Sequence, residues 1–121
     1  AGKKIVIVED SIIRGTTSRN RVRRLRESGV KEIHMAVSCP PTRYPCAYGI
    51  DFSSRGELIA AEKLEEDIAR FIGLDSLHYL SVDGMVAATG LGREDFCLAC
   101  YTGQYPIKPP DAMEKLCFEK R

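Results

Sequence analysis

A run of four β-branched residues, followed by two acids and a hydroxyl-rich loop, constrains the fold of this chain more than any other part of its sequence. The run covers residues 5–8 (Ile-Val-Ile-Val), and Glu9 and Asp10 follow it directly. An unbroken β-branched run predicts a buried strand of a parallel sheet. Residues 16–18 (Thr-Thr-Ser) are good N-cap candidates for a helix that should stop at Gly29.

The later apolar runs predict an α/β fold. A second strand is expected over residues 33–37, and strand, helix and strand within about 35 residues form a βαβ unit. Prolines at 40, 41 and 45 predict a fixed loop over residues 39–54. The remaining expected elements are a short helix capped by Ser53 or Ser54 and reaching Ala61, a helix over 64–72 ending at Gly73, a strand over 77–80, a helix over 82–88 and an irregular tail from Thr89.

The loop after the first strand has the composition of a phosphate-binding site. In open α/β sheets ligands bind at the carboxyl ends of the strands, where Glu9 and Asp10 lie. The N-terminus of the following helix offers unpaired N–H groups and the positive end of the helix dipole. Gly15 would let the backbone approach an anion closely, and residues 16–18 add hydroxyl donors. Two carboxylates beside a phosphate make sense if they hold sugar hydroxyls or Mg²⁺, so the spacing suits a ribose 5-phosphate.

Spacing alone leaves a second interpretation open. A strand ending in two acids, a turn and a capped helix occur together in many α/β proteins that bind no ligand there. The segment is not a P-loop, because Gly-Lys-Ser/Thr is absent, and it lacks the Gly-x-Gly-x-x-Gly pattern of dinucleotide sites.

Charge and hydropathy argue against two other classes of function. The net charge is +1, but residues 1–31 carry nine Lys/Arg against three Asp/Glu, and residues 32–121 carry nine against fourteen. The N-terminal part would therefore attract an anionic ligand. Five arginines crowd the first helix, but aromatic residues for base stacking are missing there, which argues against nucleic acid. No apolar run approaches the roughly 20 residues that span a bilayer, and the chain does not begin as a signal peptide would, so we expect a cytoplasmic location without membrane contact.

The cysteines suggest a metal or cluster site. There are five, an odd number, which argues against a secreted disulfide framework. Cys97 and Cys100 form a C-x-x-C pair, and Cys46 lies in the proline-rich loop, where it could be a third thiolate. In a reducing compartment, clustered cysteines more often bind metal. The pair by itself does not distinguish zinc, redox and iron–sulfur sites.

The segment from Ile5 to Ser18 resembles the phosphoribosyl diphosphate signature of type I phosphoribosyltransferases. In its Ser-Ile-Ile-Arg-Gly-Thr-Thr-Ser form it is similar to the glutamine amidophosphoribosyltransferases in particular. The resemblance covers nearly the whole chain. Its further motifs are residues 38–41 (Ser-Cys-Pro-Pro), 44–51 (Tyr-Pro-Cys-Ala-Tyr-Gly-Ile-Asp), 57–60 (Glu-Leu-Ile-Ala), 80–84 (Leu-Ser-Val-Asp-Gly) and 97–103 (Cys-Leu-Ala-Cys-Tyr-Thr-Gly).

The resemblance implies a partial type I phosphoribosyltransferase fold: a Rossmann-like parallel sheet with flanking helices, plus an irregular cysteine-bearing tail. Residues 1–88 would be the C-terminal part of the phosphoribosyltransferase domain, and residues 89–121 the tail. The family's N-terminal glutaminase domain, first strands and pyrophosphate loop would precede Ala1. We therefore expect a fragment with an open sheet edge that catalyses little by itself.

The resemblance also implies the site residues. Glu9 and Asp10 would bind the ribose hydroxyls and Mg²⁺, and would position the substrate during catalysis. The 5-phosphate would lie in the following loop, with substrate contacts from Ser11, Arg14, Gly15, Thr16, Thr17 and Ser18. Glu9 stands where Asp is more usual in the family. It keeps the charge and reaches one methylene further, so we expect binding to survive.

In many members of the family, cysteines that match Cys46, Cys97 and Cys100 hold a [4Fe–4S] cluster. Such a cluster takes four thiolates, and the family's fourth lies upstream of this chain. A structural zinc is the rival interpretation. Cys39 is expected to pack in the core, and Cys117 to be incidental.

The family reaction is the first committed step of purine synthesis. Phosphoribosyl diphosphate, glutamine and water give 5-phosphoribosylamine, glutamate and pyrophosphate, and the ammonia comes from the glutaminase domain. The full-length protein would be a homo-oligomer. The alternative is a catalytically inactive phosphoribosyl-binding or regulatory module.

Overall fold

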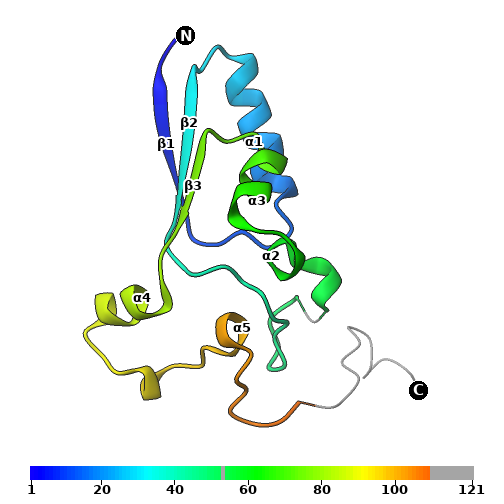
Figure 1. The fold of residues 1–121 in the computed structure, drawn as a ribbon, viewed down its shortest axis with the longest axis vertical. Coiled ribbons are helices and arrows are strands. Elements are labelled where there is room, and N and C mark those ends of the chain that lie inside the picture. Colours follow the sequence, from blue (N-terminus) through cyan, green and yellow to red (C-terminus); the bar gives the residue numbers. More distant parts are fainter. Residues whose placement is uncertain (53, 110–121) are drawn as a thin grey trace.

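A computed structural model describes residues 1–52 and 54–109 and shows a parallel sheet with helices packed on it (Figure 1). In chain order the elements are β1 (Lys4–Glu9), α1 (Thr16–Glu27), β2 (Glu32–Val37), η1 (Arg55–Glu57), α2 (Ile59–Glu62), α3 (Glu65–Ile72), β3 (Ser76–Tyr79), α4 (Val82–Thr89), η2 (Arg93–Asp95) and α5 (Ala99–Thr102), where η marks a 3-10 helix. The α/β class expected from the sequence is confirmed.

The sheet has the order β1-β2-β3, and both pairs of neighbours are parallel. Lys4 pairs with Glu32 at one end of the first pair, and Glu9 pairs with Val37 at the other. The register places the carboxyl ends of all three strands at one edge of the sheet. The loop that leaves β1 therefore begins where ligands bind in open α/β sheets.

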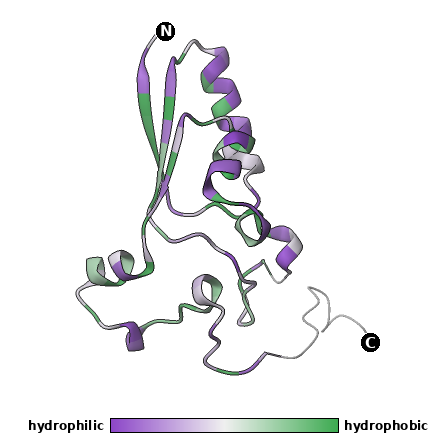
Figure 2. Cartoon of the chain, viewed as in Figure 1, coloured by the Kyte–Doolittle hydropathy of each residue, from purple (hydrophilic) through white to green (hydrophobic). Residues whose placement is uncertain are grey.

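The core lies between the sheet and the helices α1 and α3, which cover the same face (Figure 1). Alternate residues of β2 are buried, as expected when one face of a strand meets a core. The hydropathy colouring shows apolar segments on the strands and mixed polar and apolar segments on the helices (Figure 2). The largest fully buried side chains of the core are Ile33, Met35, Ile68, Ile72 and Val22.

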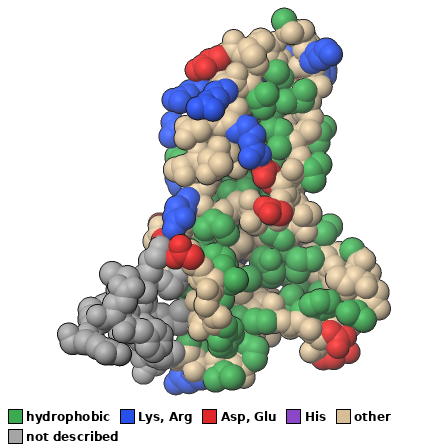
Figure 3. Space-filling model, turned by 180° about the vertical axis from the view of Figure 1, so that it is seen from behind, with side chains coloured by type: hydrophobic (Ala, Val, Ile, Leu, Met, Phe, Trp, Pro, Cys, Tyr) green, Lys and Arg blue, Asp and Glu red, His purple; other side chains and the backbone are tan. Residues whose placement is uncertain are grey.

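The expectation that β1 is fully buried is wrong, because in the described residues one face of the strand packs on the core and the other is open. Val6 and Val8 are 67% and 74% exposed, whereas Ile5 and Ile7, which alternate with them, pack against the core. In the described sheet β1 is an edge strand. Seen from behind, hydrophobic side chains lie exposed beside the Lys and Arg side chains that gather over α1 (Figure 3). Across residues 1–52 and 54–109, every helix is too short or too polar to cross a membrane.

Two expected elements differ from the structure. The helix expected to reach Ala61 is divided into η1 and α2, because Leu58 between them has an extended backbone and buries its side chain. Ser54 provides the expected cap, in a capping box with Glu57. The tail, expected to be irregular, contains the short helical turns η2 and α5. Cys117 lies outside the described residues.

Asp75 ties α1 and β2 to the start of β3. Its Oδ2 atom accepts hydrogen bonds from the Ile33 N–H at 2.7 Å and from the Arg26 guanidinium at 2.6 Å. Arg26 also donates to the carbonyls of Lys31 and Gly73. The Ile33 N–H, and then Arg26, hold the pKa of Asp75 below its usual value of 3.8.

We expect Asp75→Asn to lower the melting temperature at neutral pH and to have little effect in acid. A depressed carboxylate pKa stabilises the fold above pH 3.8, and this stability is lost as the pH falls through the folded-state pKa. Thermal melts across this pH range, with Asp83→Asn as the control, test this. Asp83 pairs with Arg93 but its side chain is 89% exposed, so its substitution should change stability less. Equal pH dependence of the two variants would contradict the prediction.

Candidate functional site

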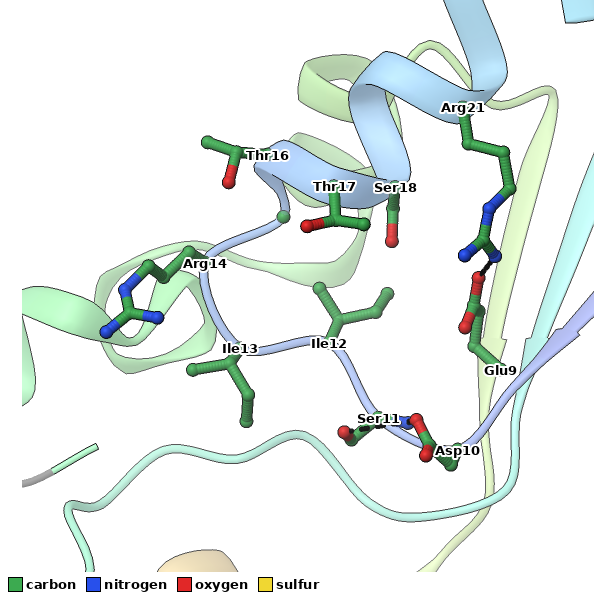
Figure 4. A pocket seen from close by; sticks show the side chains of 11 residues that line it. Glu9, Asp10, Ser11, Ile12, Ile13, Arg14, Thr16, Thr17, Ser18 and Arg21 are labelled. Carbon is green, nitrogen blue, oxygen red and sulfur yellow. Dashed lines mark hydrogen bonds and ion pairs between the residues drawn. The ribbon is translucent and has the colours of Figure 1, made fainter. Parts of the chain in front are cut away.

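The loop between β1 and α1 encloses the candidate site. A cavity of about 270 Å³ is lined by the continuous run of residues 9–18 and by Arg21 (Figure 4). The end of β1 supplies Glu9, the loop that follows supplies Asp10 and residues 11–15, and the first turns of α1 supply residues 16–18 and Arg21. The residues that the sequence predicts to bind substrate are thus brought together in one place.

The N-terminus of α1 has an open arrangement that suits an anion. Gly15 is the N-cap, with φ of 80°, and a glycine has no side chain with which to cap the helix. The expectation that residues 16–18 hold the cap is therefore wrong. They form the first turn instead, because the positive φ of Gly15 turns the chain one residue earlier. The hydroxyls of residues 16–18 lie in the first turn of the helix (Figure 4), and all three residues line the cavity. The first N–H groups of a helix lack intrahelical partners, so this helix end can receive an anion.

The loop packs against the core and is hydrogen-bonded to α2. The Ile12 side chain is buried, and the Ile13 carbonyl accepts a hydrogen bond from the Ile59 N–H at 2.9 Å. A Cβ atom on Gly15 would lie 3.1 Å from Ile59 Cδ1 and 3.3 Å from Phe71 Cε1. A glycine is therefore required both by the backbone conformation and by the space available.

The two acids have different partners. Asp10 Oδ1 accepts hydrogen bonds from the Ser11 backbone N–H at 2.6 Å and from the Ser11 hydroxyl at 3.4 Å. Glu9, at the end of β1, forms an ion pair with Arg21 of α1 (Figure 4). Sequence reasoning did not identify Arg21 as part of the site. The available signal was a cation one helical turn beyond Thr17, on the face that carries the hydroxyls.

Arg14 lines the cavity, but its guanidinium points toward η1 in Figure 4. Its Nη2 atom is 2.6 Å from Glu57 Oε1. Glu57 also accepts hydrogen bonds from the Ser54 N–H and hydroxyl. Arg14 therefore ties the loop to η1, and its contact with substrate stays a prediction.

Two known proteins with similar sequences bear the name of the same enzyme. No family model matches the chain. The amidophosphoribosyltransferase of Synechocystis sp. is 54% identical over 115 residues, which is 95% of this chain and 23% of that protein. The amidophosphoribosyltransferase of Methanocaldococcus jannaschii is 53% identical over 107 residues, which is 88% of this chain and 22% of that protein.

This chain is homologous to one segment of the amidophosphoribosyltransferases. A solved glutamine phosphoribosylpyrophosphate amidotransferase from B. subtilis, complexed with ADP and GMP, superimposes with a TM-score of 0.84 and 46% identity over 93% of this chain and 26% of that one. A structure described as the allosteric regulatory enzyme of purine biosynthesis gives the same TM-score at 45% identity. The chain spans about a quarter of the length of these relatives. The resemblance stated from the sequence is confirmed.

The cysteines expected to bind a cluster lie on two segments that meet in space. The backbone N–H groups of Arg43 and Tyr44 donate to the Cys100 carbonyl at 3.0 and 3.1 Å, so the proline-rich loop lies against α5. Burial raises the pKa of the Cys100 thiol, and the nearby Cys46 and Cys97 raise it further. Two tyrosines pack around these segments. The Tyr105 hydroxyl donates to the Pro45 carbonyl at 2.6 Å, and its ring meets that of Tyr48 edge-on.

In the described residues, Cys46, Cys97 and Cys100 do not form a compact set of metal ligands. Within residues 1–52 and 54–109, no three His, Cys, Asp or Glu side chains are grouped so that they could hold a metal ion. Three thiols gathered in one region nevertheless have the donor chemistry that zinc and iron–sulfur clusters need. Cys39 is only 6% exposed and belongs to the core cluster, so its expected packing role is confirmed.

Proposed function

We propose that this chain supplies the phosphoribosyl diphosphate-binding loop of an amidophosphoribosyltransferase. The whole enzyme would convert phosphoribosyl diphosphate, glutamine and water into 5-phosphoribosylamine, glutamate and pyrophosphate. The observation that carries the proposal is the cavity formed by residues 9–18 at the carboxyl end of β1. It is supported by about 50% sequence identity to these enzymes over most of the chain.

The helix end and the loop would hold the 5-phosphate. The first N–H groups of α1, which follow the Gly15 cap and belong to residues that line the cavity, would donate to the phosphate. The hydroxyls of Thr16, Thr17 and Ser18 would add further donors. Hydrogen bonds to a charged acceptor are worth roughly 1.5–3 kcal/mol each, so a few of them account for a specific phosphate site.

The two carboxylates would hold the ribose. Glu9 and Asp10 offer hard oxygen ligands, which suit both ribose hydroxyls and Mg²⁺. When bound, Mg²⁺ would neutralise the charge of the departing pyrophosphate. The transition state at carbon 1 is oxocarbenium-like, so positive charge grows on the ribose as ammonia replaces pyrophosphate. Fixed carboxylates beside the ring would stabilise that charge, which makes Glu9 and Asp10 electrostatic and positioning groups rather than nucleophiles.

The remaining parts of the proposal concern the whole enzyme. Ammonia would come from glutamine hydrolysis in a glutaminase domain, and the full-length protein would be a cytoplasmic homo-oligomer. The three clustered cysteines would hold a structural [4Fe–4S] cluster with a fourth thiolate from elsewhere in the protein. The reaction itself requires no electron transfer.

Titration of the chain with ribose 5-phosphate, followed by backbone amide NMR, tests the binding site. We expect shifts concentrated at residues 9–18, and about tenfold weaker binding in Thr17→Val, because one donor to a charged phosphate is lost. Thr89→Val in α4 removes a hydroxyl that bonds the Val86 carbonyl, away from the cavity, and is the matched control. Shifts elsewhere, or equal losses in the two variants, would refute the phosphate assignment.

Turnover of the full-length enzyme tests the catalytic part. Glu9→Gln and Asp10→Asn keep the shape of each side chain and remove its charge. An enzyme should lose most of its turnover in both variants, whereas a wild-type protein that binds ribose 5-phosphate without turnover would be a binding module only.

A further inference from the structure

Arg21 is the unexpected member of the cavity lining. It lies on α1, one turn beyond Thr17, and its guanidinium pairs with the Glu9 carboxylate (Figure 4). The Glu9 side chain is only 16% exposed, whereas that of Arg21 is 48% exposed. The carboxylate is thus largely withdrawn from water and meets its partner at the rim of the cavity.

The charges around the cavity make this pair important. Glu9 and Asp10 bring two negative charges to a site that is proposed to hold a phosphate. Arg14, the other cation in the lining, is paired with Glu57. Arg21 is therefore placed to offset the repulsion between the carboxylates and an anionic ligand.

The ion pair between Arg21 and Glu9 also disfavours the binding of a free metal ion. A carboxylate oxygen that accepts a guanidinium hydrogen bond is less available as a metal ligand, and the two positive charges repel each other. Removing the Arg21 charge should therefore have opposite effects on the two kinds of ligand. A sugar phosphate should bind more weakly, and a divalent cation should bind more tightly.

Other arginines of α1 are arranged differently. Arg26 bonds Asp75 and two backbone carbonyls, which makes it part of the fold. Arg23 pairs with Glu27 on the same helix at 3.9 Å, and both side chains are 68% exposed. Arg21 instead joins the helix to a carboxylate that lines the cavity.

We infer that Arg21 is a positioning residue that holds Glu9 and sets the site's preference for a sugar phosphate over a free divalent cation. The inference rests on the proposed function, because it assigns a role to Glu9 in that site. It adds a residue that the phosphate loop itself does not contain, and it gives a reason why a Glu, with its longer reach, is accommodated at position 9.

The test uses the 121-residue chain and two ligands measured separately. Mn²⁺ binding is followed by electron paramagnetic resonance, and ribose 5-phosphate binding by calorimetry in metal-free buffer. Arg21→Met keeps most of the aliphatic stem and removes the charge. We expect about three- to tenfold tighter Mn²⁺ binding and a similar weakening for ribose 5-phosphate, both decreasing with added salt. Arg21→Lys should restore much of the sugar phosphate affinity.

Arg23→Met is the matched control, since it makes the same change in net charge on the same helix. It should change neither affinity by more than about twofold, because screening weakens an exposed, more distant charge. In a Glu9→Gln background, Arg21→Met should no longer tighten Mn²⁺ binding, because the carboxylate that it frees is absent. Amide NMR spectra of each variant verify that the fold is kept.

The possible outcomes test the role of Arg21 and the proposed function separately. If the wild-type chain binds both ligands and Arg21→Met behaves like Arg23→Met, the role of Arg21 is refuted and the proposed function stands. If the two affinities change in the same direction, the charge-balance role is also refuted. If the wild-type chain binds neither ligand, the same measurements are made on the full-length protein, and absence of binding there refutes both the proposed function and this inference.

Discussion

Gly15→Val is expected to weaken ribose 5-phosphate binding by more than tenfold and to destabilise the chain by about 2 kcal/mol. Gly15 has φ of 80°, a conformation that costs an L-residue roughly 1–2 kcal/mol and a β-branched residue more. The new side chain would also press on Ile59 and Phe71, since even a Cβ atom lies 3.1 Å from Ile59 Cδ1. The loop must move to relieve this contact, and the helix N–H groups move away from the phosphate position. Urea unfolding and ribose 5-phosphate titration measure the two effects.

Gly90→Val separates backbone strain from loss of space. Gly90 has φ of 72°, and a Cβ atom there would meet nothing within 4 Å. This variant should therefore show the strain energy without the clash, and its ribose 5-phosphate affinity should equal that of the wild type. If Gly15→Val bound ribose 5-phosphate as tightly as Gly90→Val does, the prediction that the phosphate lies close to the Gly15 backbone would be wrong.

The sequence predicted the first βαβ unit well because its signals are local. The run over residues 5–8 correctly predicted a strand, although its full burial was wrong, because Val6 and Val8 are exposed. Gly29 and Gly73 both mark the ends of helices as expected. The cavity follows from the same segment, since strand, loop and helix are continuous in the chain. A site built from one stretch of sequence needs little knowledge of the tertiary structure.

The pairing of side chains could not be predicted in this way. Arg21 and Glu9 are twelve residues apart, and Arg14 and Glu57 are 43 apart, so their contacts depend on how the elements pack. Among five arginines within one helix, only the position of Arg21 one turn beyond Thr17 distinguished it, and that position did not reveal its contact with Glu9. The break at Leu58 has the same origin, because burial of that side chain prevails over the local tendency to continue a helix.

The resemblance to a family and the chemistry of the residues supported different predictions about this chain. Spacing alone left the phosphate loop and an unoccupied strand–turn–helix equally open. The ordered motifs indicated the family, and the similarity to amidophosphoribosyltransferases confirms it. The roles of Glu9, Asp10 and the cysteines are tested by the variants proposed for them.

The cysteines provide the second large effect. We expect the chain, reconstituted with iron and sulfide in the absence of oxygen, to develop the visible absorption of an iron–sulfur cluster, with a small thiol in the buffer filling the fourth ligand position. Cys46→Ser, Cys97→Ser and Cys100→Ser should each abolish most of this absorption, since each removes one thiolate. Support comes from the hydrogen bonds of the Arg43 and Tyr44 N–H groups to the Cys100 carbonyl, which hold the proline-rich loop against α5.

Cys39→Ala is the matched control for the loss of one thiol. Cys39 is buried in the core at 6% exposure, whereas Cys46 and Cys100 are partly exposed and Cys97 is exposed. The variant should lose some stability and keep the cluster absorption. Analysis of iron, sulfide and zinc in the purified protein distinguishes an iron–sulfur cluster from a structural zinc site. Stoichiometric zinc without sulfide would show that the cysteines hold zinc and would refute the cluster. Retention of the absorption in Cys46→Ser would show that the loop and the C-x-x-C pair do not share one site, because a cluster held by both must lose a ligand when either is changed.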